Sequence, residues 1–111
     1  MAVSHGFYYL MFTLLDNRPE LSQLQYIMQH GEGVITKWYD IGLKLLNGKG
    51  IKLNVIRKNH PSDAETCCTN MFSQWLESKP DASWNQLFTA LIEIGLNSAA
   101  DIIHGKSHCI R

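Results

Sequence analysis

The sequence offers two groups of residues that could do chemistry, and the first is its cysteines. Cys67 and Cys68 are adjacent, and Cys109 lies near the C-terminal end. A cysteine with a histidine as its base can act as a nucleophile. However, Cys67 and Cys68 fall on the apolar side of an expected helix, where cysteine usually behaves as a small hydrophobic residue. No orienting third group accompanies them, so we expect no catalytic residues.

The second group is His104, His108 and Cys109, whose spacing is similar to that of zinc ligands. Structural zinc sites use four ligands, and only three are together here. The group also follows the last expected helix, in a tail that frays easily. Glycines at 48–50 lack the spacing and the preceding strand of a phosphate-binding loop. We therefore expect no metal, no cofactor and no small-molecule substrate.

Length and composition indicate one globular domain. The 111 residues fit a single domain, and a hydrophobic fraction of 45% excludes a disordered tail. Ten basic residues balance ten acidic residues, and a pI near 6.9 argues against a nucleic-acid partner. The odd number of cysteines, three, indicates a reducing compartment, so we expect a cytoplasmic protein. The apolar run at 7–15 is too short to cross a membrane.

Apolar residues recur at steps of three and four, which predicts helices and almost no strand. Capping boxes are expected at Ser62 to Glu65 and at Ser83 to Gln86, each opening a helix. Connections are short, which favours an all-α, six-helix antiparallel bundle. The predicted helices run from Pro19 to His30, Val34 to Leu46, Ile51 to Lys58, Ser62 to Ser78, Ser83 to Ile94 and Asn97 to His104, the last closed by Gly105.

The apolar side of each helix predicts the core. The tryptophans could instead stack on a ligand or anchor an interface, but helical spacing favours packing for Trp38 and Trp84. Trp75 lies near a helix end, and we expect it to be partly exposed. In the helix at 51–58 the expected inward side chains are Ile51, Val55, and Ile56 or Leu53. The predicted core is Trp38, Ile41, Leu45, Ile56, Met71, Phe72, Trp84, Leu87 and Leu91.

Several segments, in order, resemble the death domain family over about Pro19 to His104. In that family a tryptophan precedes an isoleucine or leucine and then a glycine in the second helix, and a Trp-Leu pair ends the fourth. The fifth helix carries a tryptophan, a leucine and an Ala-Leu pair. The matching segments here are Lys37 to Leu45, Lys52 to Ile56, Met71 to Leu76, Ser83 to Leu91, Ile94 to Leu96 and Ala99 to Ile102.

The resemblance implies a bundle of death-fold type over residues 17–105, followed by a C-terminal tail at 106–111. Residues 1–16 have no counterpart in the family and form an apolar N-terminal extension. We expect this extension to pack against the bundle, because soluble domains rarely expose so contiguous an apolar surface. The alternative is that it is the cut edge of a longer protein.

Charge is unevenly distributed along the chain. Residues 37–58 carry six basic residues and one acidic residue, whereas 59–82 carry four acidic residues and one basic residue. Charge runs are often only solvated faces, but opposite patches also suit head-to-tail contacts between molecules. The resemblance implies such contacts, between a surface of helices one and four and a surface of helices two and three. The expected basic face is Lys37, Lys44, Lys52, Arg57 and Lys58, and the expected acidic face is Glu20, Asp63 and Glu65.

The resemblance implies a non-catalytic interaction module that joins other death-domain proteins, or copies of itself, in apoptotic or innate immune signalling. An alternative is the death domain of a receptor-like or ankyrin-like scaffold, acting as a regulatory module that does not polymerise. A thiol-dependent enzyme or a zinc protein is a third hypothesis of another class.

Overall fold

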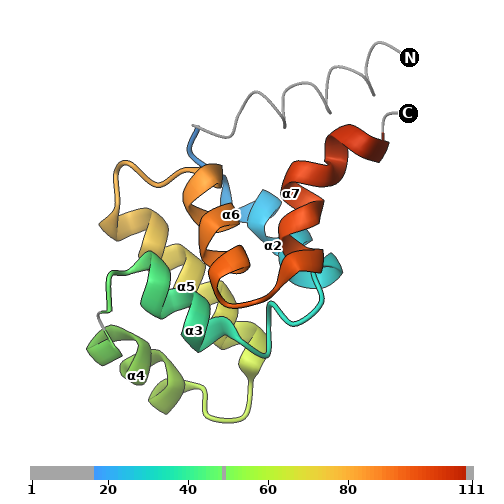
Figure 1. The fold of residues 1–111 in the computed structure, drawn as a ribbon. Coiled ribbons are helices and arrows are strands. Elements are labelled where there is room, and N and C mark those ends of the chain that lie inside the picture. The colour runs from blue at the N-terminus through green and yellow to red at the C-terminus, as the bar shows by residue number, and fades with distance from the viewer. Residues whose placement is uncertain (1–16, 49, 110–111) are drawn as a thin grey trace.

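The computed structural model describes residues 17–48 and 50–109, with side chains described as far as residue 103. Over these ranges the chain forms six helices and no strand (Figure 1), so the predicted all-α, six-helix bundle is confirmed. The expected extension at 1–16 lies outside the described residues. The helices are α2 (Leu21–His30), α3 (Trp38–Leu45), α4 (Gly50–Asn59), α5 (Ala64–Ser78), α6 (Trp84–Glu93) and α7 (Asn97–Cys109).

Helix α5 lies at the centre of the bundle and α4 lies at its edge. Helix α5 packs against α2, α3 and α4, and α7 packs against α2 and α6. Among the described helices, α4 contacts α3 and α5 alone. Figure 1 shows α4 at the end of the molecule opposite the start of α2. Most of the α4 surface therefore faces solvent.

Helices α2 and α5 run in opposite directions. Just before α2, the Arg18 guanidinium donates hydrogen bonds to the carbonyl oxygens of Leu76 and Lys79, the latter at 2.7 Å, at the C-terminal end of α5. In the last turn of α2, the Met28 sulfur accepts from the Thr69 hydroxyl in the middle of α5, at 3.8 Å. The Arg18 guanidinium also supplies hydrogen-bond donors to carbonyl oxygens that the C-terminal end of α5 leaves unpaired.

The start of α5 differs from the predicted capping box. The N-cap is Asp63 rather than Ser62: one Asp63 carboxylate oxygen accepts from the Thr66 backbone N–H at 3.0 Å, and the other accepts from the Thr66 hydroxyl at 2.6 Å. Aspartate and serine are equally good N-caps, so the local sequence does not choose between them. Ser62 lies one residue before this N-cap.

The second predicted capping box is half formed. The Ser83 hydroxyl accepts from the Gln86 backbone N–H at 3.2 Å, as expected. The Gln86 side chain does not reach back to Ser83 but donates to the Asp81 carbonyl oxygen at 3.0 Å. The other end of α6 stops at Gly95 (φ 87°), and the Leu96 N–H bonds to the Leu91 carbonyl oxygen at 2.8 Å. This Schellman geometry explains why the predicted stop at Gly95 is correct.

Two helix boundaries were wrong. Helix α3 begins at Trp38 and not at Val34, because the chain from Gly33 (φ 86°) onward makes turns that carry Val34 into the core. Helix α7 continues past Gly105 to Cys109. A glycine inside a helix costs only about 1 kcal/mol relative to alanine, so a glycine alone does not end a helix.

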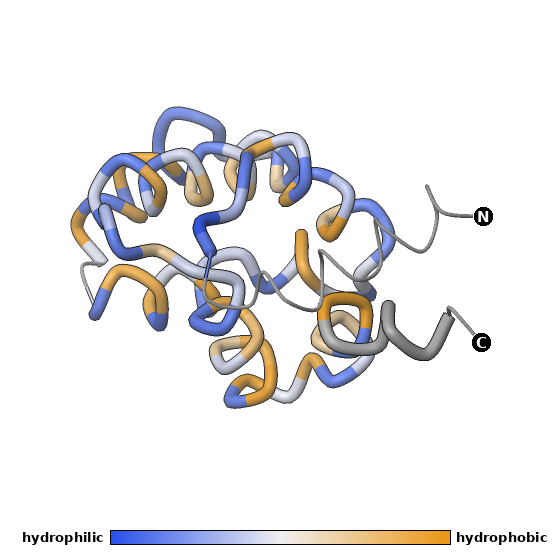
Figure 2. Tube along the Cα trace, turned by 90° about the horizontal axis from the view of Figure 1, so that it is seen from above, coloured by the Kyte–Doolittle hydropathy of each residue, from blue (hydrophilic) through white to orange (hydrophobic). Residues whose placement is uncertain are grey.

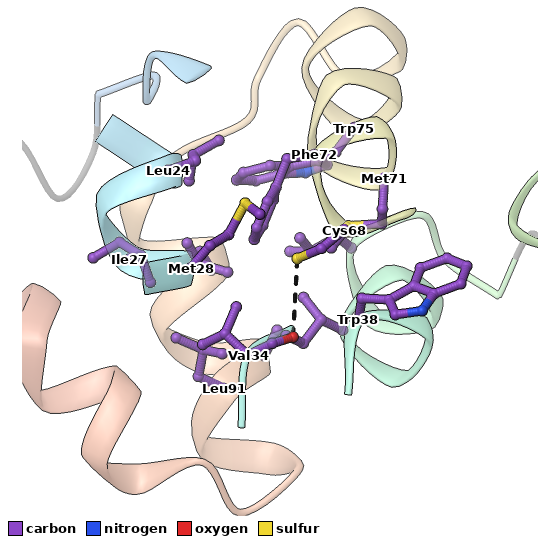
Figure 3. Packing of buried hydrophobic residues seen from close by; sticks show 14 of the residues in the cluster. Leu24, Ile27, Met28, Val34, Trp38, Cys68, Met71, Phe72, Trp75 and Leu91 are labelled. Atoms are coloured by element: carbon purple, nitrogen blue, oxygen red, sulfur yellow. Dashed lines mark hydrogen bonds between the residues drawn. The ribbon is translucent and has the colours of Figure 1, made fainter. Parts of the chain in front are cut away.

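The buried side chains form one cluster, in which α2, α5 and the turn before α3 meet (Figure 3). The Cys68 thiol points at the Val34 carbonyl oxygen, 3.9 Å away. Along the helices, hydrophobic and hydrophilic residues alternate (Figure 2), as expected for helices with one buried side. Among the predicted core residues, Ile56 is only partly buried, and Trp38, Ile41, Leu45, Met71, Phe72, Trp84, Leu87 and Leu91 are buried.

Trp75 is more deeply buried than we expected. Its side chain is 0% exposed, although we expected it to be partly exposed. Its indole nitrogen has no hydrogen-bond partner among the residues that the structure describes. The segment before α2 lies against the same helix end, where Arg18 donates to the carbonyl oxygens of Leu76 and Lys79.

Candidate functional site

The outward side of α4 carries apolar side chains that no other part of the described chain covers. Ile51 is 80% exposed and Val55 is 53% exposed, whereas Leu53 is fully buried. Residues four apart on a helix are neighbours on its surface, so Ile51 and Val55 form one patch. The prediction that both point inward was wrong. We call this patch, with the flanking Lys52 and Lys58, the α4 face.

Ile51 and Val55 are exposed because α4 packs closely against α3 on one side only. Leu53 lies directly against Gly42. A Cβ atom added to Gly42 would be 2.7 Å from a Leu53 methyl carbon and 2.9 Å from the Met71 side chain, so only a glycine fits there without movement of its neighbours. Only one side of α4 reaches the core, and Leu53 with part of Ile56 fills it. Four apolar residues in six positions are more than one side of a short helix can bury. That excess is the sequence signal that could have identified the exposed pair.

Arg57 is held in place at the end of α4. Its guanidinium carbon lies 4.3 Å from the centre of the Tyr39 ring, a cation–π contact with α3. The Tyr39 hydroxyl in turn donates to the Asn54 side-chain oxygen at 2.9 Å, which links α3 back to α4. Arg57 remains exposed and keeps its charge available.

The other basic residues are spread over two helices. Lys52 and Lys58 are exposed on α4, and Lys37 is exposed at the N-terminal end of α3. Lys44 lies 3.3 Å from a carboxylate oxygen of Glu93 on α6, and both side chains are about half exposed. Exposed pairs of this kind contribute about 0–1 kcal/mol, but Glu93 partly neutralises the Lys44 charge.

The three predicted acidic residues do not come together. Glu20 is the N-cap of α2, where its backbone N–H donates to the Gln23 side chain at 3.0 Å. It follows Arg18, which is bonded to the C-terminal end of α5, whereas Asp63 and Glu65 lie at the N-terminal end. From Asp63 to that C-terminal end, α5 spans about 20 Å.

Asp63 lies beside the basic end of α4 rather than away from it. The Asp63 N–H donates to the His60 carbonyl oxygen at 3.3 Å, directly after α4. The hydrogen bonds from Thr66 hold the pKa of the Asp63 carboxyl below its usual value, with a smaller contribution from His60. A carboxylate therefore borders the basic surface at the α4–α5 junction.

The cysteines of α5 are poor nucleophiles. Both are buried, and burial raises the pKa of the Cys67 thiol and raises that of Cys68 to about 12. The Cys67 thiol also donates to the His60 carbonyl oxygen at 3.2 Å. Thiols with raised pKa values stay protonated at neutral pH, which disfavours nucleophilic chemistry. Cys109, like His104 and His108, has a side chain outside the described part.

Two further features are absent from the described residues. No three histidine, cysteine, aspartate or glutamate side chains gather there as metal ligands would. None of the described helices has the length and apolarity that crossing a bilayer requires.

Comparison with known proteins gives one match. The family model described as the Death domain matches residues 21–107, which include all six described helices except the last residues of α7. Neither a search of curated proteins nor a search of solved structures finds a match.

Proposed function

The chain belongs to the death domain family, whose members are protein–protein interaction modules, and on that premise we propose that its α4 face binds other death-domain proteins. The proposed role is non-catalytic and cytoplasmic, in signalling that leads to apoptosis or to an innate immune response. Contacts are asymmetric: the basic residues of α3 and α4 meet an acidic surface of the next molecule. Copies of this chain and other death domains are both candidate partners.

The observation that carries the proposal is the exposed pair Ile51 and Val55 between Lys52 and Lys58. Apolar side chains at the centre of a contact, with charged side chains at its rim, are the usual composition of a protein interface. The lysines speed encounter with an acidic partner and select against basic ones. The apolar pair supplies the area that is removed from water on binding.

One small face gives a weak contact, because stable interfaces bury roughly 800 Å² on each partner. Several simultaneous contacts raise the overall affinity without any single strong one. In the proposed assembly this makes association steeply dependent on concentration. It is the physical advantage of a small, rigid interaction module.

A second candidate function is favoured by the positions of the acidic residues. Glu20 is separated by the length of α5 from Asp63 and Glu65, so the three do not make one surface to receive the basic face of another copy. This arrangement favours a different acidic partner over self-assembly. The chain would then be the regulatory domain of a receptor-like or ankyrin-like scaffold that does not polymerise.

Sedimentation of the chain over a range of concentrations and salt, alone and with candidate death domains, tests both functions. We expect Val55→Asp to weaken association at least about tenfold, because it places a charge in the apolar centre. The matched control is Ile92→Asp, which alters an exposed isoleucine on α6 (43% exposed). Equal effects of the two variants, or binding that does not weaken with salt, would contradict the proposed interface.

Lysine variants sharpen the test. We expect Lys58→Glu to weaken association more than Lys44→Glu, because Glu93 already compensates part of the Lys44 charge. Arg57→Glu should also weaken association, while circular dichroism shows intact helices. The opposite order of Lys58→Glu and Lys44→Glu would place the contact on α3 and α6 instead of α4.

A further inference from the structure

A hollow of about 450 Å³ lies where the loop between α4 and α5 meets the start of α3. Arg57, His60 and Ser62 contribute polar groups to its lining, and Trp38 and Cys67 contribute apolar ones. The Arg57 guanidinium is fixed nearby by its contact with Tyr39. The lining of this one hollow thus includes both Ser62 and a cation that is held in position.

Ser62 is exposed and is not needed for the fold of its own loop. Asp63 caps α5 in its place, through both carboxylate oxygens. No hydrogen bond of the Ser62 hydroxyl is found in the described part of the chain. Two acidic residues follow it, Asp63 one position and Glu65 three positions further on, and both are exposed.

We propose that Ser62 is a phosphorylation site for a serine kinase with a basic substrate groove. Kinases select substrates partly by charge pattern, and acidic residues after the serine fit such a groove. In the reaction the Ser62 Oγ forms a bond to the γ-phosphorus of magnesium-bound ATP. The bond from that phosphorus to the β–γ bridging oxygen breaks, ADP leaves, and the hydroxyl proton passes to a base of the kinase.

The phosphate changes the charge of the basic surface. It adds a charge of about −1.5 to −2 at neutral pH, next to Arg57 and His60 in the same hollow. The Arg57 guanidinium attracts it, and the Asp63 and Glu65 carboxylates repel it. Because it adds negative charge beside Arg57, which directly precedes Lys58 of the α4 face, the modification weakens binding of an acidic partner. This regulatory consequence rests on the proposed function, whereas the modification itself does not.

The first test measures phosphate incorporation. The whole chain, folded, is incubated with an acidophilic serine kinase and magnesium ATP, and the sites are located by mass spectrometry. We expect one phosphate on Ser62, lost in Ser62→Ala and retained in Ser22→Ala, an exposed serine without acidic residues after it. Heat-unfolded chain serves as the reference substrate. Labelling of Ser62 in the unfolded chain only, or equal labelling of folded Ser62→Ala, overturns the proposal.

The second test locates the phosphate by phosphorus NMR. In the folded chain the second pKa of the phosphate is expected to be lower than in the unfolded chain, because Arg57 stabilises the dianion. Arg57→Gln should remove most of that difference, while Lys37→Gln should leave it. An unchanged pKa in the folded chain overturns the placement in the hollow.

A comparison of partner binding by the phosphorylated and the unmodified chain separates this inference from the proposed function. Phosphorylated chain should bind an acidic death-domain partner roughly tenfold more weakly than unmodified chain. If unmodified chain binds no partner, the proposed function fails while the labelling and NMR results still decide the modification. If binding occurs and is unaffected by the phosphate, the regulatory consequence is wrong.

Discussion

Helices α4 and α5 are neighbours, yet they differ in how many of their apolar side chains are buried. In α5 the large apolar side chains Met71, Phe72 and Trp75 are all fully buried, because three other helices surround it. In α4, Leu53 is buried while Ile51 and Val55 face solvent. Both helices carry enough apolar residues to be read as core elements. The number of neighbouring helices, which local sequence does not specify, decides how many of those residues are buried.

The largest expected effect is in α5. Phe72→Ala removes a side chain that is 0% exposed and leaves a cavity among Met28, Cys68 and Trp75, so it should lower the free energy of unfolding by about 3–5 kcal/mol. Urea denaturation followed by circular dichroism measures the loss. A loss below about 1 kcal/mol would mean that this part of the core is loosely packed.

The next effect tests the seat of α4 on α3. Gly42→Val inserts a branched side chain where even a Cβ atom would come within 2.7 Å of Leu53, so it should destabilise the fold by about 1–3 kcal/mol. Hydrogen exchange should show the amides of α4 losing more protection than those of α6. Equal losses in the two helices would indicate global strain rather than displacement of α4.

A smaller effect comes from the N-cap of α5, and it depends on pH. Because the folded-state pKa of Asp63 is lowered from 3.8, its carboxylate stabilises the fold above that value. The contribution is lost as the pH falls through the folded-state pKa. Asp63→Asn keeps a good N-cap but does not titrate, so the variant should lose less stability than the wild type over that acid range. Parallel acid dependence of the two proteins would contradict this role.

The smallest effect is expected on the α4 face. Ile51→Ser should change the free energy of unfolding by no more than about 0.5 kcal/mol, because the side chain makes little contact with the core. Urea denaturation against Leu53→Ser, two positions away and fully buried, provides the matched comparison. A large loss for Ile51→Ser would show that something covers Ile51 in solution, as a second molecule would.

Much of the fold could be predicted from the sequence, because the start and the end of a helix depend on residues that are neighbours in the chain. The αL residue Asn47 (φ 56°) and the glycine after it end α3, and Gly95 ends α6, as the sequence predicts. The N-cap of α5 was misplaced by one residue because Ser62 and Asp63 are chemically equivalent as caps. The end of α7 was misplaced because glycine permits a turn but does not require one.

The candidate site was predicted less well, since it depends on contacts between helices. The basic residues of α4 are exposed as expected, but the partner of Lys44 on α6 is more than forty positions away in sequence. The separation of Glu20 from Asp63 follows from the antiparallel packing of α2 and α5. Ile51 and Val55 were missed for the same reason, because one-sided packing of α4 is a tertiary property.

The three tryptophans differ in what surrounds them, and this gives the protein two kinds of optical reporter. Trp75 and Trp84 are sealed inside the bundle, so their fluorescence follows the integrity of the fold. Trp38 is nearly buried too, but it borders the hollow beside Ser62. The fluorescence emission of Trp38 should therefore respond to a charge placed in that hollow, while the emission of Trp75 and Trp84 stays unchanged.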